Sequence, residues 1–158
     1  MCFYLDVIEA GDYKNELTLE ESKAFIKKLG YIPYFSLSGG EPFLLKHIGK
    51  LINYIGKYCR PYVLSIPSNC SMTKVMYNTL EDFLQKFPEV NVDILVSIDG
   101  IEEEHDEIRV SKGLFKKVLE TNHQLTELSS RYPRLKQKVG IVYSAFNQDK
   151  VEELINYI

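Results

Sequence analysis

The sequence predicts an α/β fold of parallel βα units, arranged as an open curved sheet or as part of a (β/α) barrel. Two observations indicate this class. The hydrophobic period alternates along the chain between strand-like runs and helical patterns. The expected strand ends lie 28, 32 and 45 residues apart, which are βαβ lengths, the last with a longer connection. No linker interrupts the series, so we expect one domain over residues 1–158.

The elements can be located from their residue patterns. Runs rich in β-branched and aromatic residues predict four strands, and they are largely apolar on both faces, as in a sheet covered on both sides. Apolar residues at helical spacing predict five helices, the first with a capping box made by Thr18 and Glu21. The strands are expected at 34–38, 62–66, 92–98 and 139–143, and the helices at 19–29, 47–57, 80–87, 115–128 and 151–158.

Composition excludes several classes of protein. Of the 158 residues 45% are hydrophobic, which is enough for a globular core, and the net charge of -3 lacks the basic surplus that nucleic-acid binding requires. No stretch approaches the roughly 20 apolar residues of a membrane span, and the first residues include acids where a signal peptide would be positive. We therefore expect a cytoplasmic protein with no nucleic-acid and no membrane partner.

Small and polar residues follow each expected strand. Because the carboxyl ends of parallel strands meet at one rim, these loops are expected to converge there on a binding site. Any one of them is also explained by ordinary turn and cap residues, and only the four together favour a site. The loops contain Ser38-Gly39-Gly40-Glu41-Pro42, Pro67-Ser68-Asn69-Cys70, Ser97-Ile98-Asp99-Gly100 and Ser144-Ala145-Phe146-Asn147.

The first loop has the composition of a site for a cation or an amine. Gly39 and Gly40 lack side chains, so a ligand can approach the backbone, and Glu41 supplies a carboxylate acceptor. Pro42 fixes the exit from the turn. A phosphate cradle would carry no such carboxylate and usually has a lysine.

These motifs resemble those of the radical S-adenosylmethionine (SAM) superfamily, in particular its SPASM, anaerobic sulfatase-maturase-like branch. The resemblance rests on Gly39-Gly40-Glu41-Pro42, on "IPSN" at the next strand end, and on "SIDG" followed by "HDEIR", and it runs over essentially the whole chain. It implies a partial (β/α)6 TIM-like barrel, here lacking its first strand. It also implies two cofactors, SAM and a 4Fe-4S cluster. Three cysteines hold the cluster, and the amino nitrogen and carboxylate of SAM chelate its fourth iron.

The resemblance assigns cofactor-binding roles to matching positions. Gly39, Gly40, Glu41 and Pro42 match the motif that binds the SAM amino group. Ser97 and Arg109 match positions that hold the methionyl carboxylate or the ribose, for which a guanidinium fork is chemically suited. The alternative for Arg109 is a surface salt bridge with one of the acids at 102–107.

Two asparagines match less strictly held positions near the nucleoside. Asn69 and Asn147 are equally explained as helix N-caps, which we favour for both. His105 is interpreted as a group that orients the "HDEIR" segment without touching the ligand.

The three cysteines differ in expected role. Cys2 resembles the third cysteine of the cluster loop, so it is the metal ligand we expect, and the other two would lie upstream of Met1. One thiolate cannot hold a cluster stably, so the chain resembles an N-terminally truncated, inactive piece of its parent. Cys59 is interpreted as a structural thiol. Cys70 is interpreted as a turn residue at a position where the family usually has glycine, with a ligand or reactive thiol as the alternative.

Two functions remain open at this stage. In the first, the intact parent is a radical SAM enzyme that generates a 5'-deoxyadenosyl radical, acts on a peptide, protein or small-molecule substrate, and receives electrons from a donor such as flavodoxin or ferredoxin. In the second, the chain is a non-catalytic α/β module that binds a ligand or partner through its rim loops. Catalytic residues cannot be assigned from the sequence.

Overall fold

The computed structural model describes residues 17–158 and confirms the predicted α/β class. Its centre is one sheet of four strands in chain order, and every neighbouring pair is parallel. Parallel neighbours in chain order require a crossover between each pair, and a helix supplies it each time. The strands are β1 (Tyr34–Ser36), β2 (Val63–Ser68), β3 (Asn91–Ser97) and β4 (Leu135–Gly140).

All five predicted helices are present, with two short additions. The capping box of Thr18 and Glu21 opens the first helix as predicted. The additions are a 3-10 turn directly after Glu41 and a short helix that begins in the acidic run at residue 103. The helices are α2 (Leu19–Leu29), η2 (Pro42–Leu44), α3 (Ile48–Cys59), α4 (Thr73–Lys86), α5 (Glu103–Ile108), α6 (Leu114–Arg131) and α7 (Val151–Tyr157).

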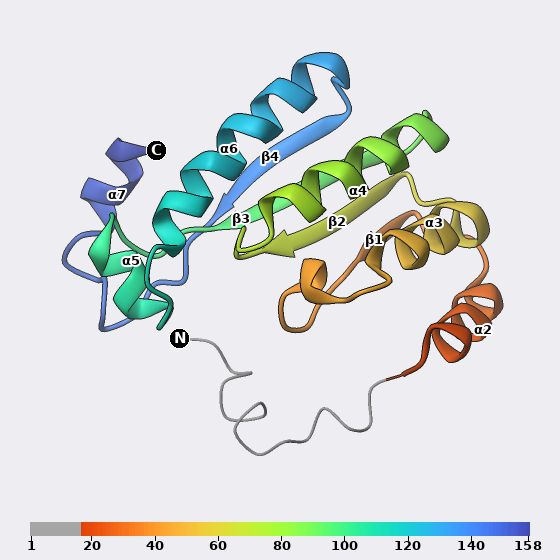
Figure 1. The fold of residues 1–158 in the computed structure, drawn as a ribbon, viewed down its shortest axis with the longest axis horizontal. Helices are drawn as coiled ribbons and strands as arrows, with labels where there is room; N and C mark the ends of the chain where they lie inside the picture. The colour runs from red at the N-terminus through yellow and green to blue at the C-terminus, as the bar shows by residue number, and fades with distance from the viewer. Residues whose placement is uncertain (1–16) are drawn as a thin grey trace.

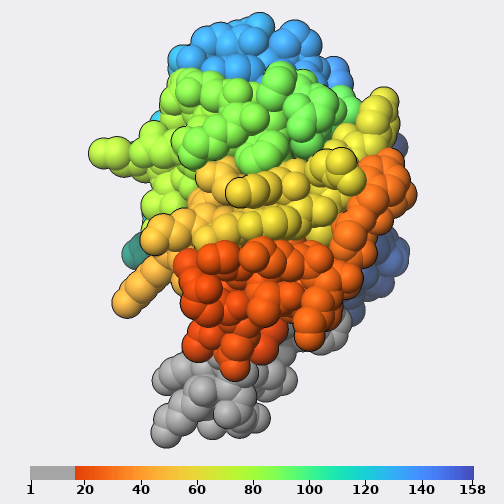
Figure 2. Space-filling view, turned by 90° about the vertical axis from the view of Figure 1, so that its right-hand side faces the viewer, coloured from red at the N-terminus to blue at the C-terminus, as the bar shows by residue number. Residues whose placement is uncertain are grey.

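The crossover helices cover one face of the sheet. Figure 1 shows α3, α4 and α6 side by side over the strands. In Figure 2 these helices lie in chain order from bottom to top, with α2 below α3 and the end of α6 at the top. Strand residues that alternate toward the helices are almost fully buried and form the core with the apolar stripes of the helices. These strand residues are Leu64, Ile66, Val92, Ile94 and Val96.

The opposite face of the sheet, called the polar face below, mixes Ser65 and Asp93 with the apolar Pro67 and Leu95, so the expectation that the strands are apolar on both faces holds only in part. Ser65 and Asp93 are neighbours in the register of β2 and β3 on this face. Lys138 of β4 lies 2.5 Å from the Asp93 carboxylate. Ser65 and Asp93 are nevertheless buried, and the ion pair with Lys138 offsets the cost of burying the Asp93 charge.

The fourth strand was predicted in the wrong place. It runs over Leu135–Gly140 and not over 139–143, and the apolar Val142 and Tyr143 are exposed in the following loop. Its residues alternate between a helix-facing set that includes Leu135 and a lysine-bearing set on the polar face. That alternation gave a weaker hydrophobic run than the loop did. The other three strands shift by one or two residues at their ends; β2 extends to Ser68.

One close contact joins α3 to α4. A Cβ added at Gly56 would lie 2.9 Å from Cε2 of Phe83 and 3.0 Å from the Phe87 ring. The glycine therefore allows two aromatic rings, whose centroids are 4.9 Å apart, to pack against the backbone of α3. Within residues 17–158 no helix is long and apolar enough to cross a membrane.

Candidate functional site

Glu41 links the first two rim loops. Its Oε1 accepts hydrogen bonds from Ser68 Oγ at 2.8 Å and from Phe43 N at 3.2 Å, and its Oε2 accepts one from Asn69 N at 2.6 Å. The Phe43 bond caps η2, and Pro42 occupies the first turn of that 3-10 helix. Burial raises the pKa of Glu41, while these hydrogen bonds and the charge of Arg109 oppose the rise.

Gly39 and Gly40 leave the backbone accessible beside this carboxylate. Both residues are exposed, and Gly39 has a φ of 142°, a conformation that favours glycine. The loop thus combines open peptide groups with a fixed carboxylate, as its composition predicted. Such a pair of features suits a ligand that carries an amine.

Asp99 links the third and fourth rim loops. Its carboxylate is 1% exposed, and Oδ1 accepts a hydrogen bond from Val142 N at 2.8 Å. The Asn147 amide donates to the Asp99 carbonyl and to the Val142 carbonyl, both at 2.9 Å. The loop after β3 is thereby fastened to the loop after β4, and these hydrogen bonds of Asp99 and Asn147 are called the clamp below.

The "HDEIR" segment is fastened to the same aspartate. Nδ1 of His105 accepts a hydrogen bond from Asp99 N at 3.1 Å, and Nε of Arg109 lies 2.5 Å from Asp99 Oδ2. The Asp106 carboxylate accepts from Phe115 N at 2.8 Å and from Gly113 N, which holds the start of α6. Each charged or aromatic member of the motif except Glu107 therefore has a structural role, and His105 orients the segment as the sequence analysis proposed.

His105 is fully buried and neutral in this setting. Burial lowers its pKa, and the nearby positive charge of Arg109 adds to that effect. Because Nδ1 is the acceptor, the proton of the neutral ring sits on Nε2, which has no hydrogen-bond partner within the described part of the chain.

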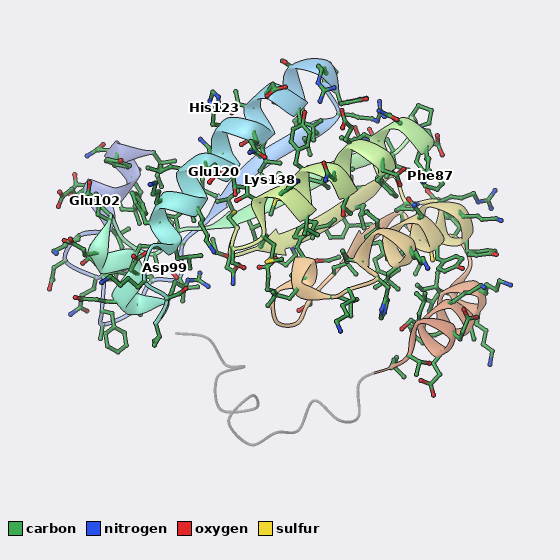
Figure 3. All side chains as sticks on the ribbon, viewed as in Figure 1. Phe87, Asp99, Glu102, Glu120, His123 and Lys138 are labelled. Atoms are coloured by element: carbon green, nitrogen blue, oxygen red, sulfur yellow. The ribbon has the colours of Figure 1, made fainter. Side chains whose placement is uncertain are left out.

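Arg109 brings the two pairs of loops together. Its side chain is 15% exposed, and its charge acts on the pKa of Glu41 after β1 and of Cys70 after β2. Arg109 also pairs with Asp99 after β3, so its guanidinium is held at the third rim loop while its charge acts on groups of the first two. The acid beside it is Asp99 and none of those at 102–107, so the surface salt bridge considered as the alternative is wrong. Figure 3 shows Asp99 at the end of the sheet where α5 lies, far from Phe87.

The remaining predicted site residues lie at the same rim. Asn69 contacts Glu41 through its backbone, as described above. Ser97 is the last residue of β3, half-buried, and pairs in register with Gly140 on the polar face. No side-chain hydrogen bond joins Ser97 to the other described site residues, so its assignment rests on position.

Neither asparagine is a helix N-cap. The caps of α4 and α7 are Met72 and Lys150. Asn69 Oδ1 instead accepts from Ser71 N at 2.9 Å in the loop before α4. Both ends of the Asn147 amide are used in the clamp, because its Oδ1 accepts from Ser144 N at 2.8 Å.

The cysteines supply no ligand set among residues 17–158. Cys2, the expected metal ligand, lies outside the described residues. Cys59 and Cys70 are both buried with free thiols, and burial raises the pKa of Cys70 to about 12. Cys70 has a φ of 62°, which explains why a glycine suits this position. In the described range no group of three His, Cys, Asp or Glu side chains could hold a metal ion.

Sequence reasoning assigned no role to Asp99 or Ser68. Both were quoted within rim loops, but their partners lie 43 and 27 residues away in the chain. The signal that could have drawn attention to Asp99 is an acid placed between an apolar strand and a glycine, a position that becomes buried.

The fold and the rim define an α/β protein whose candidate ligand site lies at the carboxyl ends of a parallel sheet. A family model described as the Radical SAM superfamily matches residues 1–158, and the chain belongs to that superfamily. The four parallel strands fit the partial barrel expected from the motifs.

Two curated relatives are similar to the chain. It is 29% identical over 156 residues to the Fe-coproporphyrin III synthase of Methanosarcina barkeri (strain Fusaro / DSM 804). The matched segment covers 92% of the chain and 37% of that protein. The chain is 24% identical over 157 residues to the sporulation killing factor maturation protein SkfB of Bacillus subtilis (strain 168), which covers 98% of the chain and 35% of that protein. The chain thus spans little more than a third of either relative.

Proposed function

We propose that residues 1–158 are the SAM-binding core domain of a radical enzyme. The proposed cofactor site consists of Gly39, Gly40, Glu41, Pro42, Asn69, Ser97 and Arg109. The single observation that carries the proposal is the position of Arg109, which pairs with Asp99 and acts electrostatically on Glu41 and Cys70. One cation that reaches the loops after β1, β2 and β3 supports a shared site.

The charges at the rim match this cofactor. SAM bears an ammonium, a sulfonium and a carboxylate, so its net charge is positive by one. Glu41, when ionised, and Asp99 supply two negative charges, while Arg109 supplies one positive charge and His105 is neutral. The resulting net charge is complementary to that of the ligand.

Each residue has a defined task in the proposal. Glu41 and the exposed peptide groups of Gly39 and Gly40 bind the ammonium, and the guanidinium of Arg109 binds the carboxylate. Pro42 and Asn69 keep the Glu41 loop in place, and Ser97 lines the polar face beside Gly140. When bound, the cofactor supplies a carbon-centred radical able to take hydrogen from a substrate.

The residues at 17–158 do not fit a 4Fe-4S cluster, because they include no set of three ligands. Its binding is therefore assigned to no residue of this part, and Cys2 remains the proposed ligand in the N-terminal segment. No step is derived through the cluster.

The substrate and the electron donor are proposed at the level of class. One relative is named as a maturation protein and the other as a porphyrin synthase, so a peptide, protein or small-molecule substrate is in keeping with both. A flavodoxin or a ferredoxin would supply electrons, and the cytoplasm is the proposed location.

The test measures SAM binding by calorimetry in the full-length gene product, reconstituted anaerobically with iron and sulfide. Glu41→Gln and Arg109→Ala are each expected to weaken binding about tenfold or more, because each removes a charge-assisted hydrogen bond. The matched controls are Glu81→Gln and Arg131→Ala, an exposed ion pair at 2.7 Å between α4 and α6.

Unchanged affinity in both rim variants would overturn the assignment of the site. Binding of SAM without its reductive cleavage in the reconstituted protein would favour the non-catalytic module over the enzyme.

A further inference from the structure

We infer that Asp99 is a positioning residue: it grips Arg109 through Nε and thereby presents the terminal nitrogens of the guanidinium to the carboxylate of the ligand. The inference rests on the proposed function and extends it, since it names the group that makes the site select a ligand with a carboxylate over one without it. Asp99 itself does not touch the ligand in this arrangement.

Asp99 is held from three sides. Val142 N donates to its Oδ1, the amide of Asn147 donates to its carbonyl, and its own N–H donates to His105. Its carboxylate is 1% exposed. The Asp99 carboxylate is therefore fixed in place. In the ion pair, the Arg109 side chain must take the conformation that reaches it.

The grip is on one edge of the guanidinium. Nε of Arg109 lies 2.5 Å from Asp99 Oδ2 in an ion pair without the angle of a hydrogen bond, and its two terminal nitrogens donate to no residue in the described range. The charge of the buried aspartate holds the Nε side of the guanidinium, which leaves the terminal nitrogens for a ligand. That edge is matched to the two oxygens of a carboxylate.

A purely structural ion pair is the competing explanation, and the same sheet offers an example. Asp93 and Lys138 also pair at 2.5 Å, with a largely buried aspartate, but the lysine is 55% exposed and lies on the polar face below the rim. Arg109 differs because it is 15% exposed and its charge reaches two other loops of the site. The Asp93 pair is thus a matched control for the removal of a buried aspartate charge.

The test compares the dissociation constants of SAM and of decarboxylated SAM by calorimetry in the reconstituted full-length protein. In Asp99→Asn, the amide oxygen can still accept from Val142 N, but the carboxylate charge that pairs with Arg109 is removed and the grip is lost. The preference for SAM over decarboxylated SAM is expected to fall about tenfold, with little change for the decarboxylated ligand. A cluster, when bound, would also hold the carboxylate, and that contribution to the preference would be the same in all variants.

A double-mutant cycle separates positioning from stability. Arg109→Ala is expected to lower the same preference at least as much as Asp99→Asn does, and adding Asp99→Asn to it should reduce the preference no further. Asp93→Asn should leave the preference unchanged even if it lowers the melting temperature. If Asp99→Asn does not fold, Arg109→Lys serves as the second variant: it keeps the charge but lacks the fork, so it should lower the preference as Arg109→Ala does.

The inference is overturned if Asp99→Asn keeps the wild-type preference, or if Arg109→Lys keeps it. It is also overturned if the wild-type protein binds the two ligands equally well, which would leave SAM binding at this site intact. If the wild-type protein binds neither ligand, the proposed function itself fails.

Discussion

The backbone N–H of Asp99 donates to Nδ1 of His105 at 3.1 Å, while the imidazole packs at 5.8 Å against the ring of Phe115. The histidine therefore serves as a neutral acceptor in an apolar setting. Burial lowers the pKa of His105, and the positive charge of Arg109 adds to that effect; protonation of Nδ1 would also remove the acceptor for Asp99 N.

This relationship predicts that the protein loses stability in mild acid. The folded-state pKa of His105 lies below its ordinary value of 6.5, so the unfolded chain takes up the proton first as the pH falls. Stability is therefore lost from about pH 6.5 down through the lowered pKa. In His105→Asn the side-chain oxygen can replace Nδ1 as acceptor without titrating. Urea unfolding at about pH 7.5 and 5 should show a smaller pH-dependent loss in the variant; an equal loss in both proteins would contradict the assignment.

The contact between α3 and α4 predicts opposite effects for two glycines of α3. Gly56→Ala should destabilise by about 1–3 kcal/mol, because its Cβ would overlap two aromatic rings in the core. Gly49→Ala should stabilise by a few tenths of a kcal/mol up to about 1, since its Cβ would be 3.9 Å from Thr79 and alanine favours the helix. Chemical denaturation measures both, and a stabilised Gly56→Ala would show that the two helices pack less closely.

The clamp between the third and fourth loops predicts a costly Asn147→Asp substitution. Asn147 is 2% exposed, and its amide N–H₂ faces two carbonyl oxygens. A carboxylate in its place would lose both hydrogen bonds and face two acceptors, so a loss of about 3 kcal/mol or more is expected. Asn122→Asp, on the exposed face of α6, is the control and should change stability by less than about 0.5 kcal/mol. Equal effects would refute the clamp.

The thiols of Cys59 and Cys70 are predicted to be unreactive in the folded protein. Both are buried, and the pKa of Cys70 is raised to about 12, so its thiolate is scarce at neutral pH. In a Cys2→Ser variant, a chromogenic disulfide reagent should detect almost no thiol until denaturant is added and two afterwards, because the chain has three cysteines. A fast-reacting thiol in that variant would revive Cys70 as a reactive group.

The fold could be predicted from the sequence to the extent that hydrophobic patterns reflect which faces are covered. The helices follow apolar stripes that pack on the sheet, and α2 has the predicted bounds, Leu19–Leu29. β4 was misplaced because only one of its faces meets a helix, so its lysines diluted the signal. Whether helices cover one face of a sheet or both depends on how the layers assemble, and the residues of one strand do not reveal it.

The rim could be predicted as a place, because strand ends fix where loops meet. The partners within it could not. Asp99 holds Val142, and Glu41 holds Ser68, through contacts that depend on how neighbouring strands are aligned with one another. The residue pattern of one segment contains no information about this alignment until the register of the sheet is known.

The two outer strands of the sheet differ in how they resist fibre formation. β1 is only three residues long, too short to template a growing stack of strands. β4 is longer but carries Lys136 and Lys138; Lys138 pairs with Asp93, so the charge of the exposed Lys136 would oppose a second copy laid against the strand. The described sheet therefore has protection against amyloid-like self-assembly at each margin, by brevity on one side and by charge on the other.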